Sequence, residues 1–167
     1  INFAQGMIID GETNPIETKY LFTDKDEKVN GLKAEYFTNM NLEGEPVKVI
    51  VDNQINFMWN DKGPFEDFQK DNFSVRWTGY VKAEKSANFT FDVASDDGVR
   101  LYIDDQLAIN DWNDHAMLTN SYSKELVADK LYMIKLEYYE KGGGAIVKFG
   151  WRKPNDELIV DAINVAK

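Results

Sequence analysis

The sequence predicts an all-β protein, an antiparallel β-sandwich or barrel followed by a short C-terminal helix. From Gly31 to about Arg152, apolar residues recur with a period of two, the spacing of half-buried strands. These runs are half polar, which is typical of antiparallel sheets rather than buried parallel ones. Clusters of Gly, Pro, Asn and Asp separate the runs and predict the turns between strands.

The clearest strand covers residues 73–82, where Phe73, Val75 and Trp77 alternate with polar side chains. Trp77 and Trp151 lie on such apolar faces, so we expect both in the core or at its rim. The same alternation predicts further strands at 88–93, 99–104, 132–139 and 145–151, and shorter ones at 32–37, 47–51 and 55–59.

Turns are expected at 41–46, 60–64, 96–98, 104–105 and 142–144. The connection 60–72 is long for a compact β-domain, and loops of this kind are often functional.

The two ends differ from the middle. Residues 1–30 are polar and irregular, whereas residues 155–167 have the apolar stripe of an amphipathic helix after Pro154. We therefore expect three parts: a flanking segment at 1–30, a β-domain at 31–153 and a flanking helix at 154–167. Ile1 stands where an initiator Met would be, so the chain is interpreted as an excised piece of a longer protein.

The composition narrows the function classes. The net charge is −10, with 29 acidic and 19 basic residues, which disfavours nucleic acid and anionic membranes. The sequence contains no run of about 18 apolar residues, the length that a membrane-spanning helix needs. The absence of cysteine excludes disulfides and thiolate chemistry. Calcium or neutral sugars fit the charge better; alternatively, the charge only keeps the domain in solution.

Several segments in order carry a family resemblance. They are GLKAEYF at 31–37, NFSVRWTG at 72–79, SDDGVRLYID at 95–104, KLEYYE at 135–140 and FGW at 149–151. Together they resemble the protective-antigen-14 domain family, β-barrel-like sandwiches of bacterial toxins, yeast adhesins and glycosidases. The resemblance implies a sandwich of that type and a carbohydrate-associated role.

The flanks carry a second resemblance. Residues 3–6 and 16–21 are similar to the stretch that precedes this insert in family-three β-glucosidases, and residues 159–167 to the helix that follows it. This implies a parent glycoside hydrolase, with neighbouring domains and a carbohydrate (a β-glucoside or a plant or cell-surface glycan) as partners, and an extracellular or periplasmic location.

Asp96-Asp97-Gly98 is the candidate metal site. Adjacent carboxylates supply the oxygen ligands that calcium prefers, and Gly98 lets the backbone bend around an ion. In sugar-binding yeast members of the family, the matching pair holds calcium through an unusual cis peptide, a geometry that sequence does not reveal. Alternatively, the pair only caps a turn through hydrogen bonds to backbone amides.

The loop at 110–115 is the candidate sugar contact. The ring of Trp112 offers a stacking face, and Asn113, Asp114 and His115 offer hydrogen bonds to hydroxyls. Alternatively, Trp112 only seals the end of the barrel. Trp59 and Phe65, at the long connection, are assigned to carbohydrate contact as well; the alternative is local packing.

No catalytic residue is assigned. His115 is the only histidine, and nothing points to partners for a Ser-His-Asp site. We therefore expect a non-catalytic module that binds carbohydrate or shapes substrate access in a glycoside hydrolase. The alternative is an interaction or assembly module of a toxin-like or adhesin surface protein.

Overall fold

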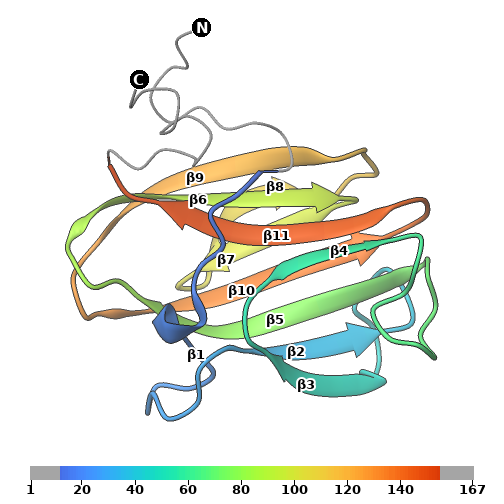
Figure 1. The fold of residues 1–167 in the computed structure, drawn as a ribbon, viewed down its shortest axis with the longest axis horizontal. Coiled ribbons are helices and arrows are strands. Elements are labelled where there is room, and N and C mark those ends of the chain that lie inside the picture. The colour runs from blue at the N-terminus through green and yellow to red at the C-terminus, as the bar shows by residue number, and fades with distance from the viewer. Residues whose placement is uncertain (1–11, 155–167) are drawn as a thin grey trace, which may run out of the picture.

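The computed structural model describes residues 12–154, which form two antiparallel sheets packed face to face (Figure 1). The predicted all-β class is confirmed, while the predicted helix lies outside the described residues. One sheet has the strand order β3-β2-β5-β10-β7-β8, with β1 also pairing with β5, and the other has the order β4-β11-β6-β9.

A 3₁₀ turn, η1 (Thr18–Tyr20), precedes the strands. In chain order the strands are β1 (Leu21–Phe22), β2 (Leu32–Phe37), β3 (Lys48–Asp52), β4 (Asn56–Asn60), β5 (Phe73–Lys82), β6 (Ala87–Asp96), β7 (Val99–Ile103), β8 (Gln106–Asp111), β9 (Leu118–Leu126), β10 (Leu131–Glu140) and β11 (Ala145–Arg152).

The centre of the larger sheet is the β5–β10 pair, in register from Phe73 opposite Glu140 to Lys82 opposite Leu131. Their inward side chains are fully buried, Trp77 among them, as the alternation predicts. In the other sheet, Phe91 of β6 stacks on Phe149 of β11 at a centroid separation of 5.9 Å. The core therefore lies between β5–β10 and β6–β11.

A buried ion pair ties β6 to the end of β11. Asp92 accepts hydrogen bonds from Arg152 Nε at 2.7 Å and Nη2 at 2.9 Å, and from Ser121 Oγ at 2.6 Å. A buried carboxylate tolerates the loss of water only when it is paired and hydrogen-bonded in this way.

Residues 12–30 pack against the sandwich. Pro15 forms a β-bridge with Gly150, and Ile16 and Leu21 are only 1% exposed. Gly79 of β5 admits this segment because a Cβ there would lie 2.5 Å from the Phe22 carbonyl oxygen. The division of the chain at residues 31 and 154 stays a prediction, but the described part of the first flank contributes to the core.

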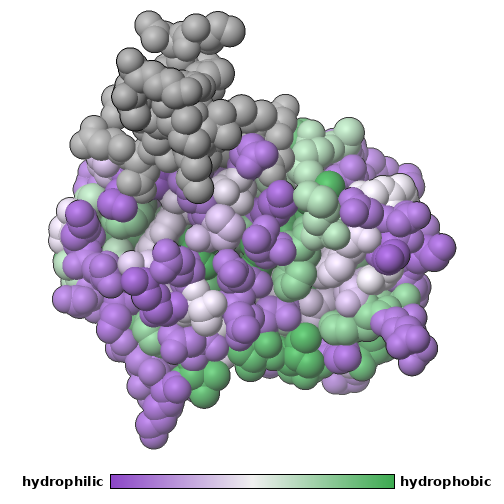
Figure 2. All heavy atoms as spheres, viewed as in Figure 1, coloured by the Kyte–Doolittle hydropathy of each residue, from purple (hydrophilic) through white to green (hydrophobic). Residues whose placement is uncertain are grey.

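The visible face of the molecule is mostly hydrophilic, with hydrophobic side chains gathered along its lower edge, over β3 (Figure 2). Val49 and Val51 of this edge strand are about half exposed, at 51% and 47%. Within residues 12–154, no helix has the length and apolar character needed to cross a membrane.

Candidate functional site

Three carboxylates meet where the central strands end. Asp96 ends β6, Asp97 follows it, and Glu140 ends β10. Each side chain offers one oxygen, and these three oxygens lie within 4.8 Å of one another. The Asp96–Asp97 peptide bond is cis.

Glu140 is the most deeply buried of the three. Its side chain is fully buried, and neither carboxylate oxygen has a hydrogen-bond partner among the described residues. Burial, a hydrogen bond that the protonated Glu140 donates to Asp97, and the negative charges of Asp97 and Asp96 together raise the pKa of Glu140 to about 10. Burial and the neighbouring Asp97 likewise raise the pKa of Asp96. Within residues 12–154, no basic side chain pairs with Glu140, so three carboxyl groups lie together here without a cation at the most buried one.

Asp97 is oriented by two loops. Its Oδ1 accepts a hydrogen bond from the His115 backbone N–H at 3.1 Å, and its Oδ2 accepts one from the Lys141 backbone N–H at 2.9 Å. The Tyr138 hydroxyl donates to the carbonyl oxygen of Asp96 at 2.6 Å. These bonds fix both aspartates relative to β10 and to the loop that follows β8.

The predicted loop at 110–115 is shorter than expected, because β8 continues to Asp111, and Asp111 organises the remaining loop. The Asp111 carboxylate accepts hydrogen bonds from Asn113 Nδ2 at 3.2 Å and Asn120 Nδ2 at 2.8 Å. The His115 Nε2 atom lies 2.9 Å from Asp111 Oδ2. Asp111 therefore holds the side chains of both Asn113 and His115, and the contact of these two residues with carbohydrate stays a prediction.

Trp112 and Asp114 lie on the adjoining surface. Asp114 accepts hydrogen bonds from the Lys141 Nζ at 2.8 Å and the Tyr139 hydroxyl at 2.6 Å, and both lower the pKa of the Asp114 carboxyl. Trp112 packs edge-on against Tyr139, and the Arg100 guanidinium lies 3.8 Å from the centre of its ring. A cavity of about 190 Å³ opens here, lined by Met40, Asn41, Trp112, Asp114, Tyr139 and Lys141.

Trp59 and Phe65 sit in the aromatic cluster under the long connection. Trp59 belongs to β4 and stacks on Phe57 at 4.7 Å. Phe65 packs against Tyr36 at 4.9 Å, and the Lys48 Nζ lies 3.7 Å from the centre of its ring. The structure thus shows local packing for both residues, and their contact with carbohydrate stays a prediction.

Glu140, Tyr139 and Lys141 were not assigned from the sequence. A signal for Glu140 exists, because the inward alternation of Leu136 and Tyr138 continues one step further and places its carboxyl on the core side. Tyr139 and Lys141 donate hydrogen bonds to Asp114, which lies 25 and 27 positions away in the sequence. A local sequence pattern therefore does not predict these contacts.

Two curated relatives share part of this sequence. The anti-sigma-I factor RsgI3 of Acetivibrio thermocellus is 37% identical over 128 residues, and the protective antigen of Bacillus anthracis is 26% identical over 121 residues. These matches cover 77% and 71% of this chain, but only 20% and 15% of the relatives. The chain therefore spans a fifth or less of the length of either relative.

Solved structures share the fold. An anti-sigma factor domain-containing protein, 37% identical, superposes with a TM-score of 0.72 over 76% of this chain and 44% of its own. The β-glucosidase of Kluyveromyces marxianus, 17% identical, gives 0.71 over 94% of this chain and 21% of its own. The PA14 sugar-binding domain of an RTX adhesin, 16% identical, gives 0.59 over 74% of this chain and 89% of its own.

The PA14 domain family matches residues 28–161, a range that contains the strands β2 to β11 and the three carboxylates. The motif order, the two-sheet architecture and this match agree. The chain belongs to the PA14 domain family.

Proposed function

We propose that this domain is a non-catalytic module that binds carbohydrate with the help of a calcium ion. The observation that carries the proposal is the convergence of Asp96, Asp97 and Glu140, in which the buried carboxylate of Glu140 has no hydrogen-bond partner among the described residues. An unpartnered buried carboxylate is costly unless a cation or a proton neutralises it.

The donor set suits calcium. Calcium takes carboxylate and carbonyl oxygens as ligands, and all three side chains here end in carboxylates. Asp96, Asp97 and Glu140 would hold the ion, and bound calcium would supply open coordination positions for sugar hydroxyls. The hydrogen bonds from the His115 and Lys141 backbones keep Asp97 facing the cluster.

The neighbouring loop supplies the sugar contacts. Trp112 offers the uncovered part of its ring, while Asn113, Asp114 and His115 border the carboxylates with groups that hydrogen-bond to hydroxyls. The sugar-binding PA14 domain of the RTX adhesin, which has this fold, supports a carbohydrate ligand.

Calcium binding is tested by thermal unfolding in excess EDTA and in excess calcium. A ligand bound only by the folded state stabilises it, by about 2.7 kcal/mol at a free concentration one hundred times Kd. We expect calcium to raise the Tm of the native chain, and Asp96→Asn to abolish most of the rise. The matched control Glu125→Gln, on an exposed site of β9, should respond like the native chain. Equal Tm values with and without calcium would refute the proposal.

The parent protein is proposed to be a glycoside hydrolase located outside the cytoplasm, in which this module binds glycan or shapes access to the active site. The fold shared with a β-glucosidase supports this host. The 37% identity to RsgI3 favours a second candidate, an anti-sigma factor that carries the module as its carbohydrate-recognition part.

The residues encoded after Lys167 in the parent gene distinguish the two candidate parent proteins. A strand and helices of a second α/β domain there are expected for the glycoside hydrolase, whereas their absence favours the anti-sigma factor.

The alternative role as an assembly module of a toxin-like or adhesin protein is tested by light scattering. This role predicts oligomers that form with a partner protein and do not respond to glycan.

A further inference from the structure

A cavity lies beside the last inward-facing residue of β11, at the opposite end of the strand from Asp96, Asp97 and Glu140. Ala145, Val147 and Phe149 are buried on the inner face, and Trp151, next in the same alternation, is only partly buried. Ile146 pairs with Asp96, so Trp151 lies five residues further along β11, roughly 17 Å away at the rise of an extended strand. The cavity is therefore separate from the carboxylate cluster.

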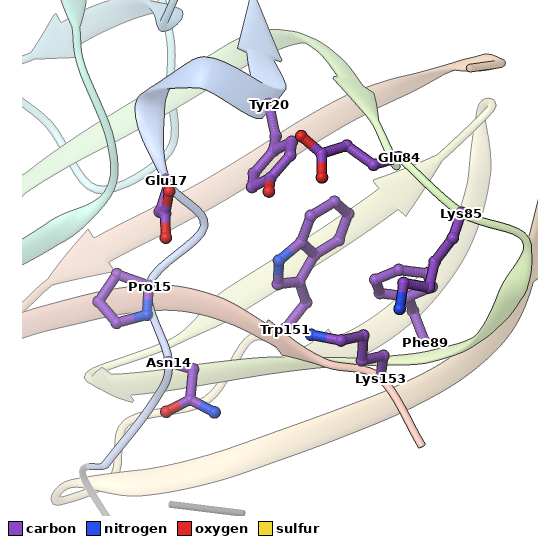
Figure 3. Close-up of a pocket in the computed structure, with 9 residues that line it drawn as sticks. All are labelled: Asn14, Pro15, Glu17, Tyr20, Glu84, Lys85, Phe89, Trp151 and Lys153. Carbon is purple, nitrogen blue, oxygen red and sulfur yellow. The ribbon is translucent and has the colours of Figure 1, made fainter. Parts of the chain in front are cut away.

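Aromatic rings form its inner wall. The Trp151 ring lies 4.6 Å from the Phe89 ring and 5.5 Å from the Tyr20 ring, at interplanar angles of 41° and 53°. Figure 3 shows the Trp151 indole at the centre of the lining residues, with Tyr20 and Glu84 on one side and Pro15 and Asn14 on another. The rings are tilted rather than stacked, and a hollow of about 200 Å³ remains against them.

Polar side chains form its rim. Glu17 and Glu84 contribute carboxylates, Asn14 an amide, and Lys85 and Lys153 ammonium groups. Glu17, Glu84 and Lys85 are exposed, whereas Asn14 is partly buried. This mixture of hydrogen-bond acceptors and donors, with both signs of charge, suits an uncharged ligand that carries several hydroxyls.

We propose that this cavity is a second saccharide site, independent of calcium, that takes one neutral pyranose unit. A volume of about 200 Å³ lies below the ~300–1,000 Å³ of pockets for drug-sized ligands and limits the occupant to a single ring. The C–H face of the sugar packs on Trp151, and the rim carboxylates and amide bind its hydroxyls. The site goes beyond the proposed function because it uses none of the residues near Asp97.

Indole N–H resonances provide a direct test. The chain has four Trp residues, so four indole signals report separately on Trp59, Trp77, Trp112 and Trp151 in ¹H–¹⁵N spectra. The probes are methyl β-D-glucopyranoside, methyl β-D-xylopyranoside, methyl α-D-mannopyranoside and methyl β-D-galactopyranoside, each titrated in EDTA and in calcium. We expect at least one probe to shift the Trp151 signal equally in both buffers.

Rim variants test the site without removing its packed rings, since loss of Trp151 itself would also disturb Phe89. A carboxylate accepts a hydrogen bond more strongly than an amide oxygen does, so we expect Glu84→Gln or Glu17→Gln to raise the Kd read from the Trp151 signal about tenfold. Glu125→Gln and Asp96→Asn should leave that Kd unchanged.

Two results would overturn the inference: a Trp151 signal that none of the four probes moves, or one whose shift disappears in EDTA or in Asp96→Asn. The calcium-assisted site is tested by the Trp112 signal and by Asp96→Asn. The failure of one site is therefore distinguishable from the failure of the other.

Discussion

Glu140 has an environment that few glutamates share. The strand that carries it is buried along its inner face, so the last inward position of β10 brings a carboxyl into the core instead of an apolar side chain. Asp97 and Asp96 then add negative charge beside this carboxyl. In the absence of a cation, the group lowers its energy by keeping a proton.

This protonation makes stability depend on pH. The pKa of Glu140 is about 10 in the folded state and ordinarily 4.5, so between these values the folded state retains a proton that the unfolded state has released. The free energy of unfolding therefore falls as pH rises across this window. The Glu140 carboxyl alone lowers it by up to about 1.4 kcal/mol for each pH unit. Glu140→Gln removes the titration, and we expect its stability relative to the native chain to increase with pH.

Urea unfolding at several pH values in EDTA measures this effect. The exposed control Glu125→Gln should give a curve parallel to that of the native chain. A constant difference between Glu140→Gln and the native chain from pH 5 to pH 9 would contradict the assigned environment.

At the scale of elements, the tight turn between β6 and β7 gives the carboxylates their position. Gly98 follows the aspartates, and a Cβ there would lie 2.4 Å from Tyr139 Cε1 and 3.0 Å from both the Asn113 backbone nitrogen and the Asp111 carbonyl oxygen. The absence of a side chain at this position is what lets the turn, β10 and the loop after β8 meet.

Gly98→Ala is therefore expected to lower the free energy of unfolding by about 1–3 kcal/mol, the usual cost of overpacking, and to weaken calcium binding. Gly142→Ala is the matched control, because nothing lies within 4 Å of a Cβ at that position and its backbone is not left-handed. Denaturant unfolding and calcium titration of both variants are the measurements. Equal behaviour of the two would show that the close approach at Gly98 is relaxed at little cost.

The strands with strong alternation were the ones that sequence could predict. β2 and β5 have the predicted bounds, and β6, β7, β10 and β11 differ from theirs only at the ends. β9 was missed because it is an edge strand whose inward positions do not alternate as apolar residues: Asn120 and Lys124 stand opposite the buried Val93 and Phe89 of β6. β1 was missed because it has only two residues.

The candidate site was predictable only in its local parts. Asp96 and Asp97 are adjacent in sequence, and Asn113 to His115 form one short loop, so each group could be recognised alone. Their meeting depends on backbone hydrogen bonds from His115 and Lys141 to Asp97, across 18 and 44 positions. Such distant contacts follow from strand pairing and leave no mark on local composition.

For the whole molecule, the first described residues act as part of the core. Ile16, Leu21 and Phe22 are at most 8% exposed, and full burial of each such side chain contributes ~1.5–3 kcal/mol. We therefore expect a chain that starts at residue 31 to lose about 5 kcal/mol or more of its free energy of unfolding.

Urea unfolding compares this shortened chain with the complete one. Val29→Ser serves as a control within the same segment, since Val29 is 50% exposed and its replacement should change stability by less than about 0.5 kcal/mol. Undiminished stability of the shortened chain would instead support the predicted domain boundary at residue 31.

Asn14 and Trp151 are held together by the hydrogen bond from the Trp151 backbone N–H to the Asn14 carbonyl oxygen at 3.0 Å, beside the bridge from Pro15 to Gly150. The first and last described segments of the chain therefore lie side by side at one end of the sandwich. This domain can therefore be inserted into a surface loop of another protein without moving the two ends of that loop apart. The loop-closure entropy that the insertion costs is small. The carboxylates of Asp96, Asp97 and Glu140, at the other end of β11, then lie on the side away from the host protein.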